Sequence, residues 1–278
     1  MTIKKQEGVI KGTHREILFD VSYNESFEYE LVPVIFMHGF KGYKDWGAFN
    51  LVAKEFAKKG FLFLKFNFSF NGTTVEKPCD FSDLEAFGNN NFTHELADLD
   101  GVLDFLFKEY GNIINRNKLT LMAHSRGGAT AIIKASEDSR IKRLITWASV
   151  GTIEGRLPNL DLEEFKRTNV LYLPNARTNQ NMPIYYQFVD DFYKNKERLE
   201  LTKRAVTLDI PVLLIHGEMD TTVGLEEAKQ LQKKIPNSDL LILKNGDHSF
   251  GASEPWSDIE LPKDLKEVVS ESIKFART

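Results

Sequence analysis

The chain has 278 residues, a hydrophobic fraction of 42% and a formal net charge of −4 at pH 7. This composition is ordinary for a folded globular protein, and the charge gives no electrostatic reason to expect nucleic acid or an anionic membrane as a partner. A single cysteine, Cys79, excludes an intrachain disulfide. Because there is neither an apolar stretch long enough to span a bilayer nor a signal-peptide pattern at the N-terminus, we expect a cytoplasmic protein.

Short apolar runs alternate with longer helical patterns, which predicts a mostly parallel sheet covered by helices on both faces. The first thirty residues alternate apolar and polar side chains, as antiparallel edge strands do. Further strands are expected at residues 34–37, 61–66, 119–123, 144–149, 212–216 and 240–243. Helices are expected at residues 48–59, 93–110, 225–234 and 265–276, with another beginning after residue 128.

Residues 151–203 interrupt this alternation. They contain no strand-plus-helix unit of the expected length, but many aromatic and polar residues. Within them, residues 170–175 and 182–188 are expected to pair as a hairpin. We interpret the segment as a cap inserted after the sixth strand, which divides the chain into a core at 1–150 and 204–278 and a cap at 151–203.

Ser125 stands between an apolar strand and a helical pattern, with the small residues Ala123 and Gly127 two positions before and after it. A nucleophile elbow needs this arrangement, because the serine occupies a strained strand-to-helix turn where larger flanking side chains would clash. The turn exposes the hydroxyl and directs the helix N-terminus at developing negative charge. The pattern therefore predicts that Ser125 is a catalytic nucleophile.

His38 and Gly39 directly follow the strand at 34–37. Backbone N–H groups placed after such a strand can stabilise an oxyanion. We expect the N–H of Phe40 to form one half of an oxyanion hole and the N–H of Arg126, next to the nucleophile, to form the other.

Asp220 and His248 lie in loops that follow the strands at 212–216 and 240–243. Imidazole suits proton transfer near neutral pH, and a carboxylate can hold it in the required tautomer. Asp247 competes for this role, but adjacent side chains in a loop rarely orient one another, so Asp220 is the better candidate. The order Ser, Asp, His along the chain fits this arrangement of strands. No histidine pair has metal-site spacing, and no metal or cofactor is expected.

On these motifs the chain resembles the α/β-hydrolase superfamily across essentially its whole length. Within it, the chain is similar to the dienelactone-hydrolase-like and cinnamoyl or feruloyl-esterase-like carboxylesterases, which also carry a cap after the sixth strand. The resemblance implies an eight-stranded sheet and hydrolysis of a small-molecule ester through an acyl-enzyme, without a cofactor. The chain departs from these relatives in having Ala123 in place of a commoner glycine, and in lacking charged residues at 66–72.

Three alternatives use the same fold. The triad could cleave peptides near a terminus. A substrate amine would then be bound by acidic residues of the cap, namely Glu163, Glu164, Asp190 and Asp191. A solvated helix face explains these acidic residues more simply. It could instead transfer an acyl group to an acceptor other than water. A catalytically inactive binding module is the third alternative, and the complete triad argues against it. The natural substrate and the oligomeric state stay open.

Overall fold

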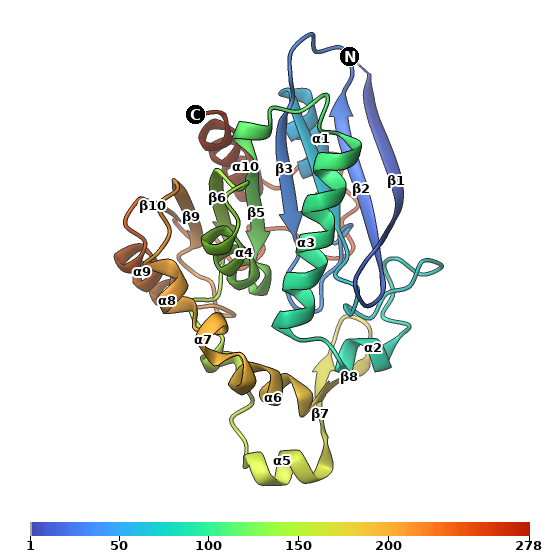
Figure 1. Ribbon diagram of the computed structural model, residues 1–278, viewed down its shortest axis with the longest axis vertical. Helices are drawn as coiled ribbons and strands as arrows, with labels where there is room; N and C mark the ends of the chain where they lie inside the picture. The colour runs from blue at the N-terminus through green and yellow to red at the C-terminus, as the bar shows by residue number, and fades with distance from the viewer. Residues whose placement is uncertain (1) are drawn as a thin grey trace.

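The computed structural model describes residues 2–278. Its main sheet has eight strands in the order β1-β2-β4-β3-β5-β6-β9-β10 (Figure 1). Their bounds are β1 Ile3–Lys11, β2 Glu16–Asn24, β3 Val32–Met37, β4 Phe61–Phe66, β5 Thr120–His124, β6 Arg143–Trp147, β9 Val212–Gly217 and β10 Ser238–Leu243. The pairs β1–β2 and β2–β4 are antiparallel and the other neighbours are parallel. The predicted mostly parallel sheet of eight strands, with an antiparallel N-terminal edge, is confirmed.

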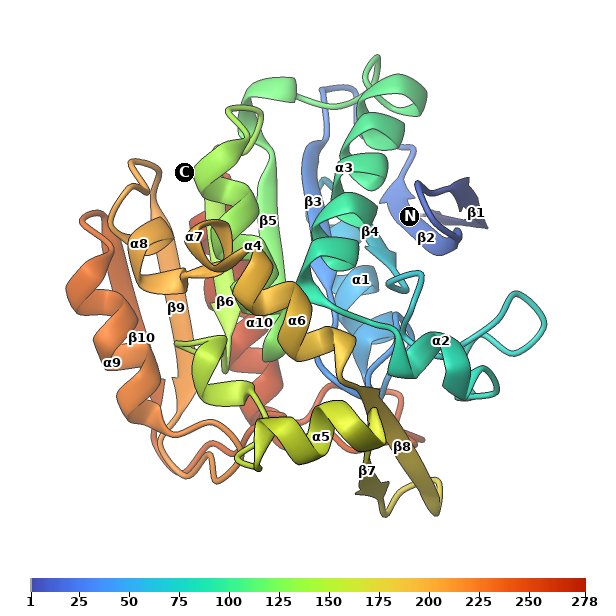
Figure 2. The same ribbon diagram turned by 60° about the horizontal axis from the view of Figure 1, so that its bottom comes forward.

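Helices cover both faces of this sheet (Figures 1 and 2). The helices of the core are α1 Phe49–Lys58, α2 Leu84–Gly88, α3 Phe92–Glu109, α4 Arg126–Glu137, α9 Leu225–Lys234 and α10 Lys263–Arg277. In β3, Phe36 packs in a hydrophobic cluster with α1 and α10, whereas Ile35 packs in the cluster that contains α3, α4 and α9. Alternate residues of a strand point to opposite faces, so a nearly continuous apolar strand serves both layers.

A segment of short helices and one hairpin connects β6 to β9, and its first part lies beyond the carboxyl ends of β3 and β5 (Figures 1 and 2). This segment consists of α5 Leu162–Thr168, β7 Val170–Asn175, β8 Gln180–Tyr185, α6 Gln187–Lys194, α7 Lys196–Leu199 and α8 Leu201–Ala205. The strands β7 and β8 form the expected antiparallel hairpin. The division into core and cap stays a prediction; α8, which crosses the predicted boundary at residue 203, packs against α4.

The structure corrects two of the predicted strands. The strand expected at 182–188 ends at Tyr185, and Phe188 belongs to α6. Helix α6 forms there because it buries Phe188, Val189 and Phe192 on one side. The strand expected at 144–149 ends at Trp147, because Ala148 takes a positive φ of 48°, which breaks the extended conformation.

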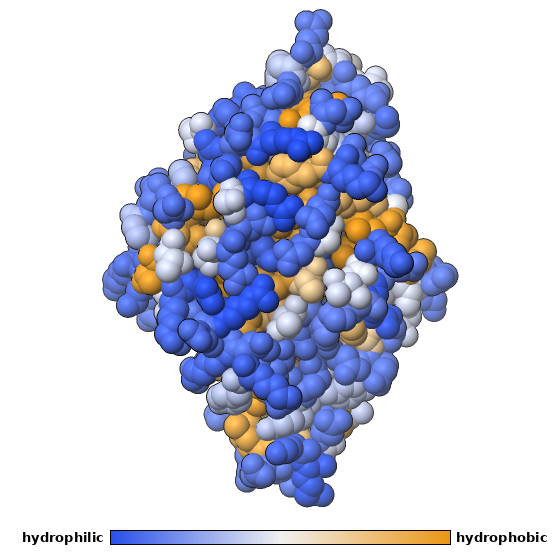
Figure 3. Space-filling view, in the orientation of Figure 1, coloured by the Kyte–Doolittle hydropathy of each residue, from blue (hydrophilic) through white to orange (hydrophobic). Residues whose placement is uncertain are grey.

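The face shown in Figure 3 is mostly hydrophilic, with apolar residues in separate patches. None of the helices in residues 2–278 combines the length and the apolar character needed to cross a membrane.

Candidate active site

Ser125 lies on the sharp turn between β5 and α4. Its backbone angles are φ 56° and ψ −123°, a conformation that residues other than glycine rarely adopt. The small residues around it are required by packing: Ala123 is fully buried, and a Cβ at Gly127 would lie 2.6 Å from the carbonyl oxygen of His38. The serine is 8% exposed, so only a small part of it is accessible to solvent.

The structure brings Ser125, His248 and Asp220 together in one hydrogen-bonded relay. Nε2 of His248 lies 3.0 Å from Oγ of Ser125, and Nδ1 of His248 lies 2.7 Å from Oδ2 of Asp220. Because a carboxylate only accepts, Nδ1 carries the proton and Nε2 is free to accept one from the serine hydroxyl. This is the geometry that a general base needs.

Asp220 is anchored by more than His248. Its Oδ1 accepts the backbone N–H groups of Thr222 and Val223 at 2.8 and 2.9 Å. Burial alone would raise the pKa of Asp220, but hydrogen bonds from His216, His248 and the Val223 N–H outweigh it and hold this pKa well below its ordinary value. The carboxylate therefore stays ionised and fixed in orientation.

The alternative acid, Asp247, has a different place. Its side chain is exposed and accepts the N–H groups of Ser249 and Gly251, at 3.0 and 2.9 Å. It thus closes the turn that carries His248. The other side of this turn is held by His124, whose Nε2 lies 2.9 Å from the carbonyl oxygen of His248. Burial, followed by the proximity of His248, lowers the pKa of His124 to about 3, which keeps its ring neutral.

The loop that contains Phe40 packs directly on the nucleophile. A Cβ at Gly39 would lie only 2.9 Å from Cβ of Ser125. The loop is braced by His38, whose ring contacts the carbonyl oxygen of Gly39 at 2.9 Å and accepts the N–H of Phe68 at 3.3 Å. Within residues 2–278, the backbone N–H groups of Phe40 and Arg126 donate to no acceptor, which leaves both available to a bound oxygen.

The side chain of Arg126 has a position that the sequence did not indicate. Its Nε donates to Glu95 at 2.8 Å, and Glu95 is only 2% exposed. The guanidinium carbon lies 4.1 Å from the ring centre of Phe92 in α3 and 5.0 Å from that of Phe188 in α6. One residue beside the nucleophile thus ties α4 to α3 and to α6.

A cavity of about 210 Å³ opens beside Ser125 and His248. Aromatic side chains form part of its wall: Phe40, Trp46, Phe49 and His124. The β7–β8 hairpin also contributes to it, with Asn175 and Arg177, and Lys41 follows Phe40. None of the four acidic cap residues considered for binding a substrate amine lines this cavity. The sequence analysis did not identify Lys41, Asn175 or Arg177, because the approach of the hairpin to the loop after β3 has no local sequence signal.

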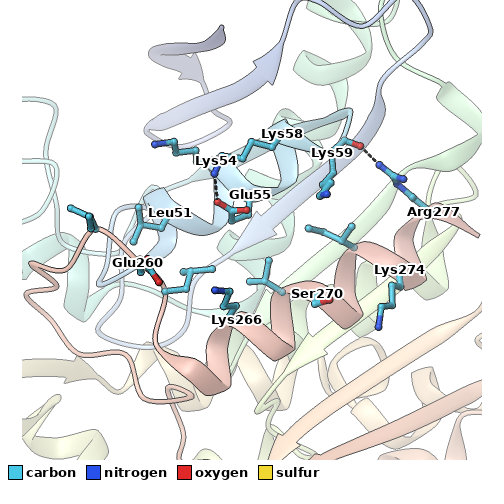
Figure 4. A pocket seen from close by; sticks show the side chains of 14 residues that line it. Leu51, Lys54, Glu55, Lys58, Lys59, Glu260, Lys266, Ser270, Lys274 and Arg277 are labelled. Carbon is cyan, nitrogen blue, oxygen red and sulfur yellow. Dashed lines mark hydrogen bonds and ion pairs between the residues drawn. The ribbon is translucent and has the colours of Figure 1, made fainter. Parts of the chain in front are cut away.

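A larger groove, of about 650 Å³, lies between α1 and α10 (Figure 4). Its charged lining is mostly basic, and the side chains of Lys58 and Glu55 pair with each other along α1, on one wall of the groove. None of Ser125, Asp220 and His248 lines it, so its size does not make it the candidate active site. No cluster of His, Cys, Asp and Glu side chains that could hold a metal ion occurs in residues 2–278.

The sheet order, the flanking helices and the elbow serine at the end of β5 define an α/β hydrolase. The model of the family described as the prolyl oligopeptidase family (Peptidase_S9) matches residues 56–261, and the chain belongs to this family. None of the curated proteins matches the chain significantly.

Solved structures of esterases and peptidases share the fold. Est1E from Butyrivibrio proteoclasticus is 16% identical with a TM-score of 0.70, and the match covers 98% of each chain. The esterase domain of a Rhodothermus marinus protein is 20% identical with a TM-score of 0.66, covering 100% of this chain and 98% of that one. The acylaminoacyl peptidase of Pyrococcus horikoshii is 14% identical with a TM-score of 0.67, covering 100% of this chain and 42% of that one. The resemblance to the α/β-hydrolase superfamily is confirmed.

Proposed function

We propose that this protein is a serine esterase that cleaves a small carboxylic ester through an acyl-enzyme, with Ser125 as nucleophile, His248 as base and Asp220 as the acid that orients the base. The observation that carries this proposal is the unbroken relay from Oδ2 of Asp220 through His248 to Oγ of Ser125, at 2.7 and 3.0 Å. The structures of an esterase domain and of Est1E, which share the fold, support it.

The reaction follows from this geometry. Oγ of Ser125 attacks the ester carbonyl while its proton moves to Nε2 of His248. The N–H groups of Phe40 and Arg126 stabilise the oxyanion, each contributing on the order of 3 kcal/mol by analogy with measured cases. The imidazolium then protonates the departing alcohol, and the ester bond to Ser125 remains. Water, deprotonated by His248, attacks this acyl-enzyme, and the protonated His248 returns the proton to Oγ as the acid leaves.

The test is hydrolysis of short-chain and aromatic p-nitrophenyl esters by the wild-type protein and by Ser125→Ala, together with labelling by a fluorophosphonate. We expect turnover and labelling in the wild type and the loss of both in the variant. Turnover that survives Ser125→Ala refutes the assignment of the nucleophile.

Peptide cleavage is the second candidate, and membership of the prolyl oligopeptidase family favours it. The fold shared with an acylaminoacyl peptidase supports it as well. An amide substrate would use the same relay, because His248 would protonate the leaving amine. Comparing p-nitroanilides of acetylated and free amino acids with the p-nitrophenyl esters, in the same preparation, separates the two functions. A higher kcat/KM for an acylated anilide than for every ester would replace the esterase proposal.

A further inference from the structure

Two positively charged side chains line the cavity beside Ser125 without carboxylate partners. Nζ of Lys41 donates to the carbonyl oxygen of Pro174 at 2.8 Å, and the guanidinium of Arg177 lies 5.4 Å from the ring centre of Phe81. Neither forms an ion pair with an Asp or Glu in the described part of the chain. Lys41 is half-buried and Arg177 is exposed, whereas the buried Lys44 is paired with Asp20 at 2.6 Å. The two cavity cations thus lack the counter-charge that Lys44 has.

The rest of the cavity wall contains no acidic side chain. Partial burial lowers the pKa of Lys41, in keeping with an ammonium group that no carboxylate compensates. Asn175, which also lines the cavity, is 7% exposed, and its Nδ2 has no hydrogen-bond acceptor among residues 2–278. A buried donor without a partner is destabilising, so this side chain is a polar group of the cavity wall whose hydrogen bonding is incomplete.

We infer that this cavity selects esters that carry a carboxylate group, which Lys41 and Arg177 bind while Ser125 attacks the ester carbonyl; this rests on the proposed function. A guanidinium matches the two oxygens of a carboxylate. The volume of about 210 Å³ lies below the usual range of ligand cavities, so the substrate is small. Lys41 follows the loop of Phe40 and Arg177 belongs to the β7–β8 hairpin, so the carboxylate would bridge these two segments.

The test compares esters that differ only in charge. One pair places the charge on the acyl side, 4-nitrophenyl hydrogen adipate against 4-nitrophenyl adipamate. The other places it on the alcohol side, 4-acetoxybenzoate against 4-acetoxybenzamide. In at least one pair we expect kcat/KM to be about tenfold higher for the carboxylate, and this preference to shrink as salt is raised, since partly exposed charges are screened.

Variants identify the groups responsible. Arg177→Ala and Lys41→Ala should each reduce the carboxylate-to-amide ratio of kcat/KM severalfold, and Arg177→Lys should retain part of it. Because both substrates are measured with the same preparation, a general loss of folded or active protein lowers both kcat/KM values equally and leaves their ratio unchanged. Lys54→Ala is the matched control, because it removes one positive charge from the groove between α1 and α10; it should keep the wild-type ratio.

The outcomes separate this inference from the proposed function. Wild-type hydrolysis with a ratio near one for both pairs overturns the carboxylate inference and leaves the esterase proposal standing. If no ester is cleaved, the esterase proposal fails, and the inference is decided by calorimetric binding of 4-acetoxybenzoate and 4-acetoxybenzamide to Ser125→Ala. Tighter binding of the carboxylate, lost on adding Arg177→Ala, supports the inference, and equal binding or none refutes it.

Discussion

Gly39→Ala tests whether the loop of Phe40 acts in the reaction. The added methyl carbon would lie 2.9 Å from Cβ of Ser125, 3.3 Å from the carbonyl oxygen of His124 and 3.4 Å from Oγ of Ser125. Two of these three contacts are with the proposed nucleophile itself. The substitution therefore presses the loop and the nucleophile apart while replacing none of the three triad residues.

The expected loss of rate in Gly39→Ala follows from the steric overlap between the added methyl group and Ser125. Ordinary contact of a Cβ begins at 3.4 Å, so the loop must move by about 0.5 Å. A displacement of about 1 Å in a catalytic site can cost on the order of 100-fold in rate, and the complete loss of one oxyanion donor about 100- to 1,000-fold. We expect the rate of acylation by p-nitrophenyl acetate to fall by roughly 10- to 100-fold in Gly39→Ala.

The assay is the rate of acylation in single-turnover experiments, with thermal unfolding as the check on folding. Gly101→Ala is the matched control: it adds the same methyl group to α3, where its only close neighbour is a methyl of Ile17 at 3.9 Å. This variant should keep the wild-type rate and gain up to about 1 kcal/mol of stability, because alanine favours a helix over glycine. A folded Gly39→Ala protein that acylates as fast as Gly101→Ala refutes the proposed role of the loop.

Three further predictions concern the acid of the relay and two buried polar contacts. Asp220→Asn should lower kcat by on the order of 10⁴-fold, by analogy with the same change in a known triad, with unchanged circular dichroism; a loss below tenfold contradicts its role. Burial raises the pKa of Asp98 to about 7. The folded protein therefore holds a proton on this carboxyl group that the unfolded chain releases above about pH 4. Because of this difference, Asp98 makes the fold less stable as pH rises from 4 to 7. Asp98→Asn should therefore stabilise the protein against urea at pH 8 relative to pH 5, by up to about 3 kcal/mol, and equal effects at both pH values refute this. Ser272→Ala removes the acceptor of the buried Trp147 indole N–H, 3.0 Å away, and should lower the free energy of unfolding by about 1–3 kcal/mol; a neutral effect in urea unfolding contradicts it.

The parts of the candidate site that sequence reasoning located are those that strand ends position. Ser125 follows β5 directly and Asp220 follows β9 by a short loop. Parallel strands finish at the same edge of a sheet, where functional groups collect, so an apolar run followed by a reactive residue predicts a place as well as a chemistry. His248 fits the same reasoning, because it follows β10 by a short loop. The strand and helix patterns were sufficient for this because they depend on local periodicity.

Contacts between distant segments had no such signal. The wrong prediction of a strand through Phe188 shows why. In the sequence this residue continues a mostly apolar run typical of a strand. In the structure it is buried in α6, with its ring 6.0 Å from that of Phe92 in α3. The cavity wall also depends on contacts between distant segments: Lys41 donates to the carbonyl oxygen of Pro174 at 2.8 Å, and Arg177 donates to the carbonyl oxygen of Lys41 at 3.5 Å. The proposed chemical steps use residues at strand ends, whereas the proposed selection of substrate uses the contact between the hairpin and the loop of Phe40. Sequence patterns therefore predict the reaction class of such a fold better than its substrate, and exchanging Arg177 tests the substrate while leaving the relay of Ser125 in place.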